Sequence, residues 1–139
     1  MLRMSKLTDY GLVLMTHLAG QGPLPVHSAR ELSVQAHLPL PTVNKLLKAL
    51  AAGGLLVSQR GIHGGYRLAR PSRQISAAQI VSALEGPIGL TECVGEGGCS
   101  FAPHCVWQSK SRSITQVLRS HLERLSLSEL TAPAGEVRR

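Results

Sequence analysis

The hydrophobic pattern of the chain changes period after residue 54, and this change limits which folds are open to it. Four apolar residues recur at helical spacing just before that point: Val43, Leu46, Leu47 and Leu50. Gly53 and Gly54 follow them and are typical of a helix end. Residues 55–59 and 66–68 then fit two short strands, with the glycine-rich sequence "RGIHGG" between them. The pattern predicts a helix that runs directly into a two-stranded hairpin.

Two further helical patterns precede this unit. The sequence "SKLTDYGLVLMTHLAG" places apolar residues on one face of a helix that we expect to end near Gly20. Ser28 and Glu31 form a capping box for a short helix over residues 29–36. Pro41 suits the first position of the third helix, because an N–H there would have no helical partner. The order of helix, short helix, turn, helix and two-stranded ribbon predicts a winged helix-turn-helix.

The second half of the chain is expected to hold two helices separated by a loop. Ser76 and Gln79 form another capping box, and their helix should stop at Gly86. A cysteine-containing loop follows, roughly over residues 91–105. A long helix is then expected from Val106 to about Leu125, with an apolar stripe made by Trp107, Ile114, Val117, Leu118, Leu122 and Leu125.

A long amphipathic helix outside a small domain must bury its apolar stripe somewhere. Packing against the same helix of a second copy is the economical solution, so we expect a homodimer; folding back onto its own domain is the alternative. The expected fold is therefore mainly α. It comprises a winged helix-turn-helix domain over residues 1–72, a loop and dimerisation helix over 73–130, and a flexible tail over 131–139.

The charge of the chain suggests a polyanionic partner. Among 139 residues there are 15 Lys and Arg against 8 Asp and Glu, which gives a net charge of +7. Such an excess favours nucleic acid over a membrane surface, although a basic protein without such a partner is the alternative. No stretch is long and apolar enough to span a bilayer, and the N-terminus lacks the apolar core of a signal peptide. We therefore expect a cytoplasmic protein with reduced thiols.

The third helix and the hairpin supply a candidate DNA-reading surface. Thr42, Asn44, Lys45 and Lys48 lie away from the apolar face of the helix, where they can reach base edges and phosphates. Pro41 sets the helix N-terminus, whose free N–H groups can meet a phosphate. The wing carries Arg60 and His63 at its tip, and Gly64 helps its backbone turn close to a minor groove. A solvated basic face and a plain turn are the alternatives for each feature taken alone, so double-stranded DNA is expected because the features occur in this order.

All three cysteines lie on one glycine-rich loop, at Cys93, Cys99 and Cys105, with five residues between neighbours. Structural zinc sites usually bring ligands in pairs two to four residues apart, which matches poorly. Iron–sulfur clusters are held by thiolates at looser spacing on irregular loops, which matches better. An iron–sulfur cluster is the favoured interpretation, with zinc and a metal-free redox thiol as alternatives.

Three stretches together resemble a known family: "KLTDYGLVLMTHLA", "RGIHGGYRLARP" and the C-x5-C-x5-C loop. They are similar to the iron–sulfur-sensing winged-helix regulators, which include the IscR, NsrR and SUF-operon regulators, over nearly the whole chain. The resemblance implies a dimeric transcription factor, usually a repressor, and the opening "SKLTDYG" looks most like regulators found with SUF cluster-assembly genes. It also implies that the three cysteines hold the cluster and that Arg60 enters the minor groove.

The chain departs from this family at one position. IscR-like members carry a histidine three residues after the third cysteine, whereas this chain has Gln108. Asp9 is our first candidate for the fourth ligand, because NsrR-like members use an aspartate in the same "TDYG" context, reaching across the dimer. His104, beside Cys105, is the second. A helix-start carboxylate is the other interpretation of Asp9. The departure leaves [2Fe–2S] and [4Fe–4S] clusters both open.

These observations favour a DNA-binding regulator whose operator affinity depends on a cluster. An iron–sulfur carrier or electron-transfer protein would explain the cysteines but neither the wing nor the basic excess. A thiol- or zinc-dependent redox repressor is a further alternative. The sequence has no arrangement of nucleophile, base and phosphate-binding loop typical of an enzyme, so we expect neither catalysis nor a small-molecule substrate.

Overall fold

The computed structural model describes residues 3–22, 25–94 and 97–133. It is mostly helical with one two-stranded antiparallel sheet, which confirms the expected fold class. The main elements are α1 (Lys6–Gly20), α2 (Ala29–Ala36), α3 (Leu40–Ala52), β1 (Leu56–Gln59), β2 (Gly65–Leu68), α4 (Ala77–Glu85), α5 (Gln108–Arg124) and α6 (Leu127–Thr131). Three short 3-10 turns complete it: η1 (Ser72–Gln74), η2 (Glu92–Val94) and η3 (Ala102–His104). Across the described ranges, each helix is too short or too polar to cross a lipid bilayer.

Most of the helices begin at a serine whose side chain caps the helix with a hydrogen bond. The capping boxes expected at Ser28 and Ser76 are both present, with each serine hydroxyl accepting from the backbone N–H three residues later. The third helix begins at Leu40, one residue before the predicted start. Pro39 occupies the extended cap position, so Pro41 is the second helical residue and not the first. It still loses no hydrogen bond, because the first four N–H groups of a helix have no helical partner.

The hairpin has the expected topology, with slightly shifted ends. Leu56 pairs with Leu68 and Gln59 pairs with Gly65, so β1 starts one residue later and β2 one residue earlier than predicted. The segment before α2 forms an isolated antiparallel bridge with β2. His27 and Tyr66 exchange backbone hydrogen bonds, with N···O distances of 2.9 Å for His27 N–H and 2.8 Å for Tyr66 N–H. This bridge fixes the wing to the first part of the chain.

The hydrophobic core joins both halves of the sequence. Leu14 and Leu18 of α1, Leu32 of α2 and the inner face of α3 form most of it. Ile75, Ile80 and Leu127, from beyond residue 72, are fully buried in the same cluster. The boundary expected at residue 72 therefore separates parts that share one core, and the proposed division of the chain stays a prediction.

The long helix differs from the prediction at its start. It begins at Gln108 and not at Val106, and Trp107 occupies the cap position. After it, the structure has a helix that the sequence analysis did not predict, α6, and its Leu127 is fully buried. The N–H of Ala77 donates to Leu125 (2.8 Å), and the N–H of Leu127 donates to Ile75 (2.7 Å). These bonds return the chain to the core. The expected flexible tail falls mainly on residues 134–139, outside the described part.

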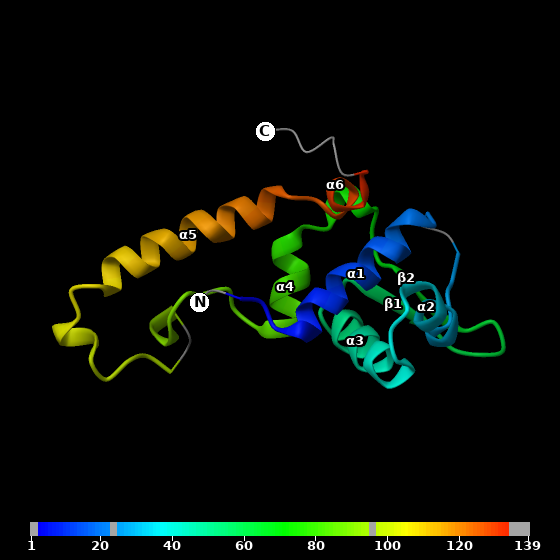
Figure 1. Cartoon of the computed structure of the whole chain (residues 1–139), viewed down its shortest axis with the longest axis horizontal. Coiled ribbons are helices and arrows are strands. Elements are labelled where there is room, and N and C mark those ends of the chain that lie inside the picture. The colour runs from blue at the N-terminus through cyan, green and yellow to red at the C-terminus, as the bar shows by residue number, and fades with distance from the viewer. Residues whose placement is uncertain (1–2, 23–24, 95–96, 134–139) are drawn as a thin grey trace.

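The wing and the cysteine loop lie at opposite ends of the molecule. Figure 1 shows the β1–β2 turn at one end of the long axis, beside α2, and the loop between α4 and α5 at the other. Between them, α1 and α4 cross the middle of the structure, and α5 extends from the cysteine loop back to α6. Within one chain, the helices therefore separate the cysteine loop from the wing.

Candidate nucleic-acid interface and cysteine loop

The outer face of α3 presents the expected polar residues to solvent. Asn44, Lys45 and Lys48 are exposed and Thr42 is half-buried, while the opposite face is fully buried. Pro41 is exposed at the helix N-terminus. The apolar face of α3 therefore anchors the helix, which leaves a polar face that a DNA groove can receive.

The wing extends this surface. Arg60 and His63 are exposed at its tip, and the N–H of Gly64 donates to Gly61 at 2.9 Å to close the turn. Gly65 lies where β2 meets the segment before α2. A Cβ atom on Gly65 would lie less than 3.0 Å from the carbonyl of His27 and 2.9 Å from the amide nitrogen of Ser28. A glycine is required there because both neighbours are backbone groups that cannot rotate away.

The charge of the chain is distributed unevenly along it. From Tyr10 to Leu84, Glu31 is the only acidic residue, and its carboxylate is used by the α2 capping box. The same stretch carries seven cationic residues: Arg30, Lys45, Lys48, Arg60, Arg67, Arg70 and Arg73. The part of the chain that contains α3 and the wing is therefore almost purely cationic, which suits a phosphate backbone.

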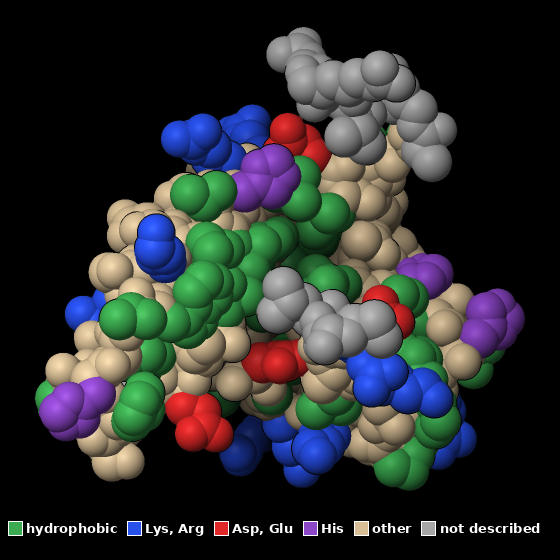
Figure 2. Space-filling model, turned by 60° about the vertical axis from the view of Figure 1, so that its left-hand side comes forward, with side chains coloured by type: hydrophobic (Ala, Val, Ile, Leu, Met, Phe, Trp, Pro, Cys, Tyr) green, Lys and Arg blue, Asp and Glu red, His purple; other side chains and the backbone are tan. Residues whose placement is uncertain are grey.

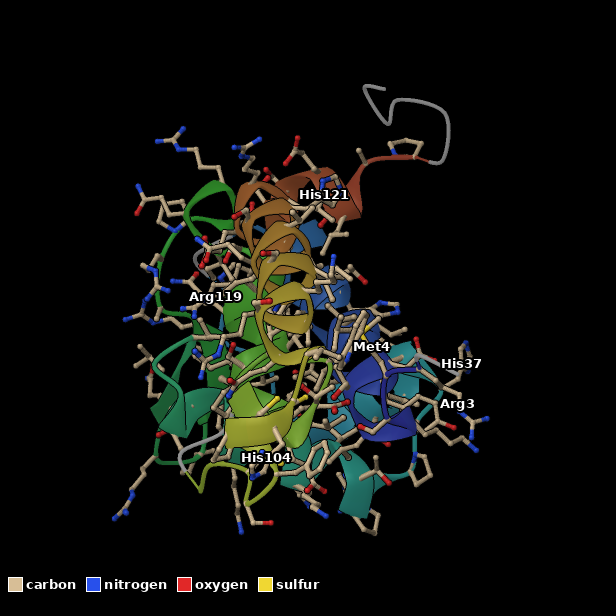
Figure 3. All side chains as sticks on the ribbon, turned by 90° about the vertical axis from the view of Figure 1, so that its left-hand side faces the viewer. Arg3, Met4, His37, His104, Arg119 and His121 are labelled. Atoms are coloured by element: carbon tan, nitrogen blue, oxygen red, sulfur yellow. The ribbon has the colours of Figure 1, made fainter. Side chains whose placement is uncertain are left out.

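The structure does not bring the cysteines together into a metal site within one chain. Cys93 and Cys105 are half-buried and Cys99 is exposed, and all three are free thiols. Among the described residues, no three His, Cys, Asp or Glu side chains are grouped so that they could hold a metal ion. Neither candidate for the fourth ligand joins them: Asp9 is exposed in the first turn of α1, and His104 is exposed at the end of η3. In Figure 3, His104 lies on the cysteine loop, and His121 lies near the other end of α5.

Cys93 is joined to α5 through hydroxyl groups. The Thr91 hydroxyl lies 2.8 Å from the Cys93 sulfur and 2.9 Å from the Ser111 hydroxyl. One turn along α5, the Thr115 hydroxyl accepts the N–H of Leu90 at 3.3 Å. Our sequence analysis missed these residues. The signal was a serine and a threonine four residues apart, each seven residues before a leucine of the stripe, Leu118 and Leu122, and so on the same side of α5 as these leucines.

Most of the apolar stripe of α5 faces outward. Trp107, Ile114, Val117 and Leu118 are exposed, and Val117 keeps 71% of its surface accessible. Leu122 and Leu125, at the other end of the stripe, are half-buried. In contrast, the buried residues of this helix are the polar pair Ser111 and Thr115. Figure 2 shows apolar side chains gathered in a band over this face of the molecule. The described part of the chain therefore covers the stripe only toward the C-terminal end of α5 and leaves the rest exposed.

Tight packing links α4, the helix that precedes the cysteine loop, to α1 and to the end of α3. The Ser5 N–H donates to the Glu85 carboxylate at 2.7 Å, which ties the start of α1 to the end of α4. This bond and the side-chain bonds from Thr8 and Ser5 lower the pKa of Glu85; the bond from Thr8 has the largest effect. A Cβ on Gly53, at the end of α3, would stand 2.8 Å from Ala83 of α4. The loop therefore follows directly from a helix that is packed against the end of α3.

Comparisons with known proteins agree with these features. The sequence model of the Rrf2 family, described as iron-dependent transcriptional regulators, matches residues 4–133. The chain is 28% identical over 132 residues to the HTH-type transcriptional regulator IscR of Cronobacter sakazakii, covering 93% of this chain and 80% of that protein. It is 31% identical over 131 residues to a putative HTH-type regulator of Haemophilus influenzae, covering 90% and 85%.

Solved structures agree with the described fold. CymR, described as the global cysteine regulator of B. subtilis, superposes with a TM-score of 0.69 at 30% identity, covering 94% of this chain and 97% of that one. IscR of T. potens gives a TM-score of 0.64 at 30% identity, with coverage of 99% and 92%.

Proposed function

Since the chain belongs to the Rrf2 family of iron-dependent transcriptional regulators, we propose that it binds operator DNA as a homodimer under the control of an iron–sulfur cluster. Its role as a DNA-binding transcriptional regulator, and not an enzyme, follows from the family and from the relatives it matches. The dimer, the cluster and the direction of regulation are the proposed parts. The observation that carries them is a loop holding all three thiols next to a helix whose apolar stripe is mostly exposed.

The helix α5 supports the dimer. It buries small hydroxyl side chains against its own chain and exposes large apolar ones, which is the reverse of a helix that packs only within a monomer. Exposed apolar area of this kind costs free energy in water, at about 25 cal/mol per Å². A second copy that lays the same stripe against it would remove that cost in a symmetric interface. Two recognition helices would then be available for two half-sites.

The donor set of the loop supports the cluster. Three thiols without disulfide partners are the ligand type that iron–sulfur clusters use. Gly98 has a left-handed backbone, with φ of 63°, and lets the loop turn beside Cys99. We propose Cys93, Cys99 and Cys105 as ligands, with Asp9 of the partner subunit or His104 as the fourth. When bound, the cluster would supply a group whose presence and oxidation state respond to iron and oxidants.

For the DNA surface we propose that Thr42, Asn44 and Lys45 read base edges and phosphates from α3, together with Pro41 and Lys48. Arg60, His63 and Gly64 would contact the adjacent minor groove. The exposure of α3 and the near absence of acidic residues around it support this arrangement. We further propose that the protein represses genes for SUF-type cluster assembly, which the "SKLTDYG" opening supports.

The test is purification without oxygen, followed by addition of iron and sulfide, visible absorption, Mössbauer spectroscopy and operator-shift assays. We expect a coloured protein whose operator affinity differs at least tenfold from that of the metal-free form, equivalent to about 1.4 kcal/mol. Cys99→Ser should abolish both the colour and the difference, whereas Ser100→Ala on the same loop should change neither. A colourless protein, or equal affinity in both states for each candidate operator, would contradict the cluster-dependent switch.

A further inference from the structure

The cysteine loop meets α5 at a chain of three polar groups. The Cys93 sulfur, the Thr91 hydroxyl and the Ser111 hydroxyl follow one another at 2.8 and 2.9 Å. Ser111 is fully buried, and Cys93 and Thr91 are half-buried. Buried hydroxyl groups need hydrogen-bond partners, so these contacts determine where each group can lie.

The chemistry of the sulfur determines which group donates and which accepts in these hydrogen bonds. A thiolate can only accept hydrogen bonds, and a hydroxyl group has a single proton to donate. When Cys93 is a thiolate, the Thr91 hydroxyl must donate to it, and its oxygen is then free to accept from Ser111. The Thr91 hydroxyl therefore links the Cys93 sulfur to the Ser111 hydroxyl on the buried face of α5.

We propose that Thr91 is a positioning residue that hydrogen-bonds the Cys93 sulfur as a cluster ligand and joins that ligand to α5 through Ser111. The inference rests on the proposed function for the cluster and adds residues to it. Hydrogen bonds to ligating sulfur are among the factors that set the reduction potential of an iron–sulfur cluster. Through Ser111, the same bond ties the ligand to the helix that carries the exposed apolar stripe.

A neighbouring contact allows the hydrogen bond from Thr91 to sulfur to be tested separately from the attachment of the loop to α5. Leu90 is already held to α5 by its hydrogen bond to Thr115, one helical turn from Ser111. The segment that leads into the loop is therefore attached to α5 by a hydrogen bond that does not involve a cysteine sulfur. Removing the Thr115 hydroxyl should loosen the loop without altering the ligand, whereas removing the Thr91 hydroxyl should alter the ligand itself.

The test compares Thr91→Val, which keeps the shape and loses the hydroxyl, with Thr91→Ser and with Thr115→Val as the control. We expect the cluster in Thr91→Val to have a lower midpoint potential and to be lost to a chelator on the order of ten times faster. Thr91→Ser should restore both values, and Thr115→Val should leave the potential unchanged. An unchanged potential in Thr91→Val, or the same change in Thr115→Val, would overturn the proposal.

A second measurement uses metal-free protein, so that failure of the cluster is distinguishable from failure of the hydroxyl chain. Thr91→Val, Ser111→Ala and the double variant are unfolded in urea at one protein concentration. Because the two hydroxyl groups contact each other, the double variant should shift the midpoint by less than the sum of the single shifts. Additive shifts would overturn the chain between Thr91 and Ser111. If the native protein takes up no cluster, the proposed function fails, and this cycle alone decides whether the hydroxyl chain exists.

Discussion

Replacing Gly65 with alanine should detach the wing from the rest of the protein. The new Cβ would lie within 3.0 Å of the His27 carbonyl and the Ser28 amide nitrogen, and both are backbone groups. Relief requires β2 to move away from the segment before α2. That movement breaks the two bonds between His27 and Tyr66, at 2.9 and 2.8 Å.

The size of the effect follows from these contacts. Two backbone hydrogen bonds contribute about 1 kcal/mol each, and crowding in a packed region costs about 1–3 kcal/mol. We therefore expect Gly65→Ala to lower the free energy of unfolding by about 3–5 kcal/mol. With a urea slope of about 2 kcal/mol per M, the midpoint should fall by about 1.5–2.5 M. A displaced wing should also weaken operator binding by about tenfold, because Arg60 is moved with it.

The assay is urea unfolding followed by circular dichroism at one protein concentration, because a dimer makes stability depend on concentration. Gly97→Ala is the matched control, since no atom lies within 4 Å of a Cβ there and its φ is ordinary. The reasoning is refuted if Gly65→Ala and the native protein share one midpoint. It is also refuted if Gly97→Ala shifts the midpoint as far as Gly65→Ala does.

Three further predictions concern charge, assembly and pH. Lys45→Ala should reduce the slope of log affinity for DNA against log salt by about one, and Lys110→Ala on α5 should leave it unchanged; equal slopes for all three proteins would refute the contact. Val117→Glu should yield a folded monomer in analytical ultracentrifugation while Gln116→Glu stays dimeric, because only the first puts a charge into the exposed stripe. The pKa of Glu85 is lowered from 4.5, so its carboxylate stabilises the fold above that pH and the contribution is lost as pH falls through the lowered value. Glu85→Gln should therefore lower the urea midpoint at pH 7, with a gap that narrows in acid; a gap that widens in acid would contradict the assignment.

Local signals in the sequence were sufficient to predict most elements of the fold. The capping boxes at Ser28 and Ser76 depend only on residues three apart, and both helices begin where predicted. The start of α3 was placed one residue late, because both Pro39 and Pro41 suit a helix start and only the extended backbone of Pro39 distinguishes them. A further box, Ser126 with Glu129, was present but was not used, and α6 was missed as a result.

The remaining differences depend on contacts between distant residues. Leu127 is buried because the chain after α5 bonds to Ile75, and no periodicity within five residues indicates that return. The cysteines were recognised as one set from their spacing, but the position of each thiol depends on how the loop meets α5. The hydroxyl chain through Thr91 and Ser111 joins positions 20 residues apart, which pattern analysis of either segment alone does not reveal.

The separation of the wing from the cysteine loop along the long axis has a consequence for engineering. The two ends share no residue, and the core between them includes Leu56 and Leu68 of the wing strands but no described residue of the cysteine loop. A chimera that exchanges residues 91–105 with those of a relative should therefore recognise the same promoter while answering to a different stimulus. In such an architecture, mutations that change the recognised promoter and mutations that change the detected stimulus can accumulate independently during evolution.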